Sequence, residues 1–100
     1  MPPYQRVRVS GPSMVPALRH GDMVIVRHGA RVRSGDIVLA TFRELPGRLV
    51  LKRAVRPVDG GWLLASDNAF AGGDSATYGV ADVHGRVVLR VSRGMPRRVR

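Results

Sequence analysis

Residues 49–65 of the chain read LVLKRAVRPVDGGWLLA, two short apolar runs separated by a turn sequence. The first run, Leu49 to Val58, and the second, Trp62 to Ala65, consist largely of the β-branched and other apolar residues that form strands. Between them, Asp59-Gly60-Gly61 supplies the residue types that tight hairpin turns require. This stretch therefore predicts two antiparallel strands joined by a hairpin turn.

Short β-branched runs punctuated by Gly, Pro and Asp continue on both sides of this hairpin, as expected of strands joined by turns. Helical signal is weak, and we expect single helical turns only at Pro16 to His20 and at Val80 to Val83. The sequence thus predicts a mainly β fold. The further strands that we expect are Arg6 to Val9, Met23 to Arg27, Ile37 to Phe42 and Arg86 to Val91.

The length of the chain, 100 residues, suits one domain with one modest core. We expect the folded domain over residues 6–92, with a flexible tail at residues 1–5 and a basic flexible tail at residues 93–100. Inside the domain, residues 66–79 (SDNAFAGGDSATYG) form the longest segment without strand or helix character. A loop of this length in so small a domain is usually functional or disordered.

The chain contains no cysteine, which excludes a disulfide scaffold, a thiolate nucleophile and thiolate metal sites. No stretch approaches the roughly 18 apolar residues of a membrane span, and the N-terminal MPPYQRVRV lacks the apolar region of a signal peptide. We therefore expect a cytoplasmic protein with no membrane anchor in this chain.

The chain carries 17 basic and 7 acidic residues, and a formal charge of +10 would by itself suggest nucleic acid or an acidic membrane surface as the partner. The arginines, however, are spread over almost every predicted strand and turn, and aromatic residues make up only 5% of the chain, which gives few surfaces for base stacking. We do not expect nucleic acid as a partner, and a basic nucleic-acid-binding module stays as an alternative.

Lys52 is the only lysine among these 17 basic residues, and it lies in the middle of the apolar run Leu49 to Val55. Apolar neighbours remove water from an inward-pointing ammonium and lower its pKa, so that a neutral amine becomes accessible. Arginine cannot do this, since its pKa above about 12 keeps it protonated in proteins. Lys52 is therefore a candidate general base, and the alternative is a strand lysine whose amine reaches solvent.

Ser13 lies in the sequence Gly-Pro-Ser-Met-Val-Pro directly after a predicted strand. The prolines on both sides restrain the backbone around its hydroxyl, and Gly11 allows another chain to approach closely. Ser13 is therefore a candidate nucleophile, and the alternative is a serine that only stabilises the turn.

The three histidines, His20, His28 and His84, have no Asp or Glu at a spacing that would orient them for a Ser-His-Asp triad. We expect them to be surface residues. A metal site at His20, Asp22 and His28 is not expected, because the set lacks a recognised ligand spacing. The sequence gives no reason to expect a metal or another cofactor.

Four segments together are more specific than any single motif in the chain. They are GPSMVPALRHGDMVIV, RSGDIVLA, LVLKRAV and SDNAFAGGDSATYG. In this order they resemble the conserved boxes of the signal peptidase I and LexA-type Ser-Lys peptidases, and the similarity covers roughly residues 7–91. Within this clan the chain looks most like the maturation proteases of nickel-type superoxide dismutase, which share the AGGDS loop and lack a membrane anchor. The resemblance implies a small β fold with short helical turns and a long loop on the catalytic side.

The resemblance also implies roles for individual residues. Ser13 matches the nucleophile, and Lys52, in Leu-Lys-Arg-Ala-Val, matches the general base. The backbone N–H of Ser13 would help to bind the oxyanion, in a turn supported by Gly11 and Met14. In the familiar bacterial signal peptidases a hydroxyl side chain two residues before the nucleophile is a second donor, and Gly11 cannot supply it.

In the long loop, two pairs of residues match the Asp-Asn and the later Asp-Ser of the family. These are Asp67 with Asn68, and Asp74 with Ser75.

Three positions of the loop depart from the family's pattern. Ser66 replaces the leading glycine, Gly72 replaces the serine that orients the lysine, and Ala76 replaces the arginine that pairs with the later aspartate. The orientation of Lys52 and the partner of Asp74 are therefore the points on which a structure is needed.

The resemblance implies a serine endopeptidase that removes an N-terminal extension from a precursor, bound as an extended strand at a sheet edge. For the nickel-type relatives that precursor is a superoxide dismutase. The alternative within the clan is a catalytically inactive LexA-type dimerisation domain, for which Gly72 and Ala76 would be signs of decay.

Overall fold

The computed structural model describes residues 3–99, which form seven strands and one short helix. The elements are β1 (Tyr4–Arg8), β2 (Met23–His28), β3 (Ile37–Phe42), β4 (Val50–Val58), β5 (Gly61–Ala65), α1 (Ser75–Tyr78), β6 (Ala81–Ser92) and β7 (Met95–Arg98). None of the helices in this part of the chain has the length and apolar character that crossing a membrane requires.

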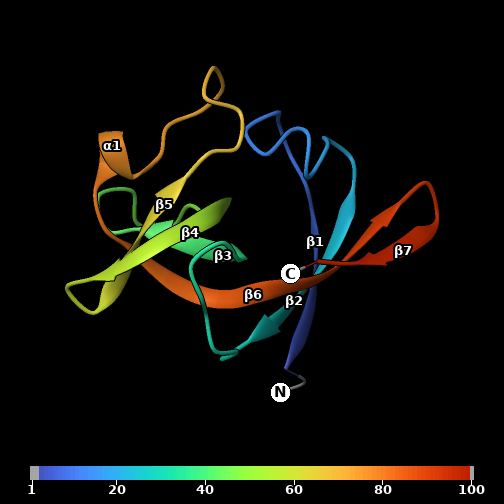
Figure 1. Cartoon of the computed structure of the whole chain (residues 1–100), viewed down its shortest axis with the longest axis horizontal. Coiled ribbons are helices and arrows are strands. Elements are labelled where there is room, and N and C mark those ends of the chain that lie inside the picture. Colours follow the sequence, from blue (N-terminus) through green and yellow to red (C-terminus); the bar gives the residue numbers. More distant parts are fainter. Residues whose placement is uncertain (1–2, 100) are drawn as a thin grey trace.

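All strand pairs are antiparallel, in the order β1-β2-β6-β3-β4-β5, with β7 added to β6. A further pairing between Trp62 of β5 and Ala81 of β6 closes β6, β3, β4 and β5 on themselves. At the other end of the order, β1 pairs only with β2 among the strands described. The fold is thus a closed group of four strands continued by a short open sheet whose free edge is β1 (Figure 1).

The long strand β6 joins these two parts (Figure 1). Its first half pairs with β3 and its second half with β2, and the ladder is shifted by irregularities in both pairings. Gly85 lies between the halves, where a Cβ atom would come within 2.6 Å of the Arg27 carbonyl oxygen. Only glycine fits at this close approach, which lets β6 bend from one part to the other.

The buried side chains form two clusters, one on each side of this bend. The first contains Val9, Met14, Leu18, Val24, Val26, Ile37, Leu39 and Val87. The second contains Val38, Ala40, Phe42, Ala54, Leu64 and Ala81.

The predicted mainly β fold is confirmed, and the hairpin around Asp59-Gly60 joins β4 to β5 as the turn sequence predicts. The helical turn expected at Val80 to Val83 is wrong, because β6 already begins at Ala81. The segment Pro16 to His20 forms turns without a helix. Residues 66–79, expected as loop throughout, contain the one-turn helix α1 at their end, where the Asp74 carboxylate accepts a hydrogen bond from the Ala76 N–H.

Both expected tails differ from the structure. β1 already begins at Tyr4, and Met95–Arg98 form β7, whose backbone pairs with β6. All four side chains of β7 are exposed. The sequence therefore lacks the alternation of apolar and polar residues that would predict this strand. The parts of the expected tails at residues 1–2 and at residue 100 lie outside the described residues.

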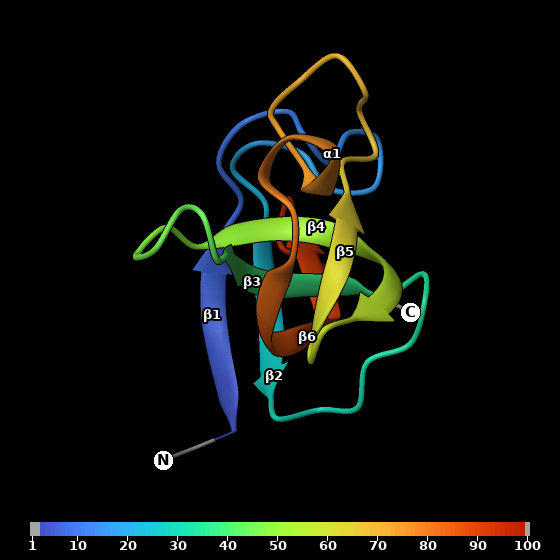
Figure 2. The same ribbon diagram turned by 90° about the vertical axis from the view of Figure 1, so that its left-hand side faces the viewer.

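Two loops meet at one end of the molecule. The segment after β1 and the long segment between β5 and α1 rise from different parts of the sheet and lie at the same end in both views (Figures 1 and 2). The Asn68 N–H donates a 2.9 Å hydrogen bond to the Ser13 carbonyl and so joins the two loops. This junction brings the predicted nucleophile and the predicted supporting loop together.

Candidate active site

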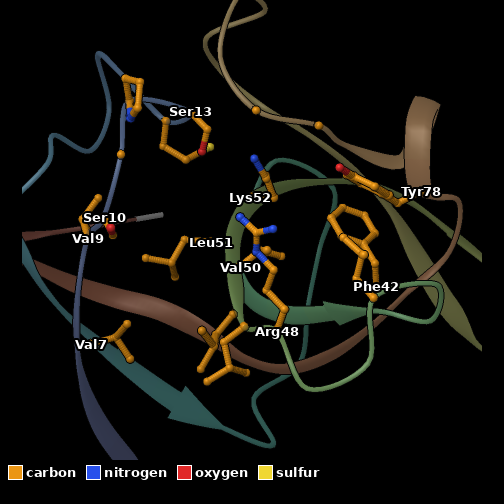
Figure 3. Close-up of a pocket in the computed structure, with 18 of the residues that line it drawn as sticks. Val7, Val9, Ser10, Ser13, Phe42, Arg48, Val50, Leu51, Lys52 and Tyr78 are labelled. Atoms are coloured by element: carbon orange, nitrogen blue, oxygen red, sulfur yellow. The ribbon is translucent and has the colours of Figure 1, made fainter.

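A cleft of about 420 Å³ lies beside this junction. One wall is formed by β1 and the turn that follows it, and the other by residues 48–52 with Phe42 and Tyr78 behind them. Ser13 belongs to the first wall and Lys52 to the second, and the Lys52 amine points toward Ser13 (Figure 3).

The position of Ser13 is fixed from both sides. Met14, 1% exposed, anchors the turn in the first core cluster, and the Val15 N–H donates to the Pro12 carbonyl at 3.1 Å. Asn68 holds the same turn through its backbone N–H to Ser13 and through its side-chain amide to the Pro12 carbonyl at 3.2 Å. Asn68 therefore positions the turn that carries Ser13, and it does not line the cleft.

Gly11 has a φ of 84°, a conformation that favours glycine, and its N–H donates to Nδ1 of His20 at 2.9 Å. This N–H is therefore occupied and does not point at the cleft as a free donor. The N–H groups of Ser13 and Met14 donate to no acceptor within residues 3–99. The oxyanion donors that the turn can offer are these two backbone groups.

Lys52 lies on β4 opposite Val38 of β3, and only 5% of its surface is exposed. Its amine donates a 2.9 Å hydrogen bond to the Ser66 hydroxyl. Burial lowers the pKa of Lys52 below its ordinary value of 10.5, with the charge of Arg48 adding to the effect and that of Asp74 opposing it. The strand thus holds an amine whose neutral form is stabilised, as the apolar run in the sequence predicts.

Ser13 and Lys52 meet at Gly72. A Cβ atom at Gly72 would lie 3.3 Å from the Lys52 Nζ atom and 3.4 Å from the Ser13 Cβ atom, so both side chains border the same small space. Within the described chain no direct hydrogen bond joins the Lys52 amine to the Ser13 hydroxyl. The two groups face each other with the amine held by a third residue.

The residue that holds the Lys52 amine is Ser66, and this contact changes the interpretation of the departures at Ser66 and Gly72. The sequence suggests that the hydroxyl orienting the lysine has been lost at Gly72, but a serine hydroxyl is present on Lys52 and comes from Ser66. Gly72 has a φ of 72° and leaves the space that both side chains border. The hydroxyl has therefore moved six positions along the loop and still reaches the amine.

The second departure, Ala76, is also compensated. The Asp74 carboxylate accepts hydrogen bonds from the backbone N–H groups of Ala76 at 3.0 Å and Ser66 at 3.3 Å. Backbone donors thus replace the missing arginine. Because one of them belongs to Ser66, Asp74 also supports the residue that binds Lys52.

The remaining loop residues act away from the cleft. Asp67 forms an ion pair with Arg53, which follows Lys52 on β4, with the Arg53 Nε atom 3.1 Å from the carboxylate. The Ser75 hydroxyl accepts a 2.7 Å hydrogen bond from the Leu64 N–H. Both interactions fasten the ends of the loop to β4 and β5, and neither side chain lines the cleft.

Three side chains at the cleft carry no signal that we used in the sequence. Tyr78 of α1 packs on Phe42 with ring centroids 5.3 Å apart, and Arg48 lies to one side of both, below Lys52, in the close-up (Figure 3). A Cβ atom at Gly73 would come within 2.3 Å of the Tyr78 ring. The second glycine of AGGDS therefore makes room for Tyr78, and this glycine is the one feature of the sequence that could have indicated it.

His28 and His84 lie on the paired strands β2 and β6, and His20 lies in the segment before β2. His20 accepts from Gly11, His28 contacts the Gln5 side chain, and His84 contacts Thr41. Over residues 3–99 no group of three or more His, Cys, Asp or Glu side chains is arranged to hold a metal ion.

The chain matches the family described as Peptidase S24-like over residues 3–88, which include both cleft walls and the loop between β5 and α1. No curated protein matches the sequence significantly. The family match confirms the resemblance to the LexA and signal peptidase I clan, at the level of the clan. The chain therefore belongs to the Peptidase S24-like family.

Proposed function

We propose that this protein is a serine endopeptidase that uses Ser13 as its nucleophile and Lys52 as its general base. The observation that carries the proposal is the buried Lys52 amine, directed toward Ser13 and held by the Ser66 hydroxyl. A lysine in such surroundings is suited to accept a proton, because desolvation favours its neutral form. Membership of a peptidase family supports the same reaction class.

The reaction proceeds in two stages. Neutral Lys52 takes the proton of the Ser13 hydroxyl as Oγ attacks the peptide carbonyl, and the resulting ammonium gives that proton to the leaving amine. Lys52 then takes a proton from water, which attacks the acyl ester, and returns it to Ser13 Oγ as the ester bond breaks. The N–H groups of Ser13 and Met14 are the donors available to the oxyanion in both stages.

The cleft suits an extended peptide. β1 has a free edge beside the cleft, and Val7 and Val9 line it from this side. A substrate that adds to this edge gains main-chain hydrogen bonds and places alternate side chains in the cleft. Because the lining near Ser13 is apolar, small uncharged residues are expected next to the scissile bond.

For the substrate, we propose the N-terminal extension of a nickel-type superoxide dismutase precursor. The support is the AGGDS loop, whose first glycine borders Ser13 and Lys52 and whose second makes room for Tyr78. Purified protein incubated with such a precursor should release the intact extension, as measured by mass spectrometry. Cleavage of other peptides but not of this precursor would reject the substrate and leave the peptidase in place.

The proposed reaction class is tested by covalent labelling. A peptidyl fluorophosphonate should add to Ser13 Oγ with loss of fluoride, and peptide mapping should find the label there and not on Ser10 or Ser66. Labelling that is absent, or that is equal on all serines, would favour an inactive dimerisation domain.

The lowered pKa of Lys52 predicts the direction of the pH dependence. Because the neutral amine is the active form, kcat/KM should rise with pH through the pKa of Lys52 and level off below 10.5. The positive charge of Arg48 lowers this pKa, so Arg48→Gln should move the rising limb to higher pH. Rate profiles between pH 5 and pH 10 measure both effects, and a limb that does not move on this substitution would argue against Lys52 as the titrating group.

Ser66→Ala removes the hydroxyl that holds the Lys52 amine. We expect kcat to fall by about 10- to 100-fold, since a small displacement of a catalytic group has a cost of this size. Ser66→Thr keeps a hydroxyl and should restore part of the activity.

The matched control for this substitution is Ser34→Ala, which removes a hydroxyl that donates to the Val55 carbonyl outside the cleft. It should leave kcat unchanged. Equal losses in the two alanine variants would mean that the Ser66 hydroxyl has no particular role at Lys52.

A further inference from the structure

Arg48 is a charged group in the cleft that the reaction does not use. It precedes β4 on the wall that carries Lys52, and its guanidinium points into the cleft toward the Lys52 amine (Figure 3). The side chains that line the cleft include Arg8, Arg48 and Lys52 but no aspartate or glutamate. The cleft therefore has an excess of positive charge.

Other arginines around the site have partners, and Arg48 does not. Arg8 donates to the Gly21 carbonyl at 3.3 Å, Arg43 pairs with Asp82 at 2.9 Å, and Arg53 pairs with Asp67. For the Arg48 guanidinium, no carboxylate or hydrogen-bond acceptor lies within bonding distance anywhere in residues 3–99. Its donors are free for a ligand.

The surroundings of Arg48 favour a carboxylate as that ligand. Leu45, Leu49 and Val50 line the same cleft, as do the rings of Phe42 and Tyr78. A guanidinium presents its N–H groups in a planar fork that matches the two oxygens of a carboxylate. Apolar neighbours offer no competing acceptor, so an acidic side chain of the substrate would be the natural partner.

Arg48 also acts on Lys52 while it is unpartnered. While Lys52 is protonated, the two positive groups repel each other, and a substrate carboxylate at Arg48 would reduce this repulsion. An acidic substrate residue would therefore be bound both by the fork and by the net positive charge of the cleft.

We propose that Arg48 selects substrates with an aspartate or glutamate in the part of the peptide that occupies the cleft. This inference rests on the proposed peptidase function and names the class of its substrate. Arg48 lies four residues before Lys52, in the segment that leads into β4 at Val50. Since the arginine side chain reaches back toward Lys52, we expect the acidic residue within about four residues of the scissile bond, at about 3.3 Å per residue of an extended peptide.

The experiment compares peptides that differ only by Glu or Gln. In a set of peptides with small residues at the scissile bond, one Glu is moved through successive positions and each peptide is paired with its Gln counterpart. The wild-type protein should show a ratio of kcat/KM, Glu over Gln, of about 5- to 20-fold at one position or two neighbouring positions, as expected for a charge-assisted hydrogen bond.

Variants assign this preference to Arg48. Arg48→Gln should reduce the Glu/Gln ratio to about 1, and Arg48→Glu should favour a peptide with Lys at the same position. Arg43→Gln is the matched control, because Arg43 is a neighbouring exposed arginine that pairs with Asp82 and does not line the cleft. It should keep the wild-type ratio.

The outcomes separate this inference from the proposed function. Wild-type cleavage with a Glu/Gln ratio near 1 at every position, or a ratio unchanged in Arg48→Gln, overturns the role of Arg48 and leaves the peptidase intact. If no peptide is cleaved, the peptidase proposal fails. Binding of the same labelled peptides to Ser13→Ala then tests whether Arg48 recognises an acidic residue. Tighter binding of Glu peptides that is lost in the Ser13→Ala, Arg48→Gln double variant supports the acidic site, and equal binding overturns it.

Discussion

Replacing Lys52 by methionine is expected to lower kcat/KM for peptide cleavage by about 10³-fold or more, because the general base is removed while the shape of the side chain is kept. Lys52→Arg should be equally inactive. It keeps a positive charge at the site, but a guanidinium stays protonated and cannot accept the proton of Ser13. Rates measured with a fluorogenic peptide test both variants.

The same methionine variant should be at least as stable as the wild type. Lys52 is buried and its pKa is lowered, so the folded state carries a cost while the amine is charged. That cost applies at pH values below the lowered pKa and disappears as the pH rises toward the ordinary value of 10.5. Denaturant unfolding at neutral pH measures it.

Arg56→Met is the control for both measurements, because Arg56 is an exposed basic residue on the same strand. It should change neither the rate nor the stability appreciably. Cleavage retained by Lys52→Arg would contradict the mechanism, whatever the stability of the variant.

Replacing Ser13 by alanine should lower kcat/KM by about 10⁴-fold or more, since loss of the nucleophile removes the acyl-enzyme route. The substitution should lower the rate of the chemical step and leave the fold intact. The turn is held by Met14 and Asn68, which the substitution leaves in place. Peptide binding should therefore persist, as measured by fluorescence anisotropy.

Ser10→Ala removes the other serine hydroxyl that lines the cleft and is the matched control. It should retain most of the activity. Cleavage by Ser13→Ala would show that Ser13 is not the nucleophile. An equal loss of cleavage in Ser10→Ala would show that the loss is not specific to Ser13.

The sequence predicts most of the strands because their side chains alternate between core and solvent or form apolar runs bounded by turn residues. β3 is predicted to the residue, since both of its ends are marked by this change of composition. The first half of β6 is missed because Gly85 looks like a turn, whereas it is required by a close backbone approach inside the strand. β7 is missed because all of its side chains are exposed.

At the site, the sequence identifies Ser13 and Lys52 as candidates from two local features, a restrained turn and a lone lysine in an apolar run. It does not identify Ser66 as the partner of Lys52, because that depends on where the loop returns in space. Arg48 is hidden for a different reason. Among 16 arginines, nothing in the sequence distinguishes the one whose guanidinium points into the cleft toward Lys52.

The long strand β6 makes the distance between nucleophile and base a property of the entire fold. Met14, next to Ser13, belongs to the first core cluster, and Ala54, two residues after Lys52, belongs to the second. Neither cluster holds both reacting groups, and β6 is the strand that pairs with members of each part. If Ser13 and Lys52 react as proposed, cleavage requires both parts of the fold to be intact, because a molecule in which one part is unfolded no longer holds the two side chains together.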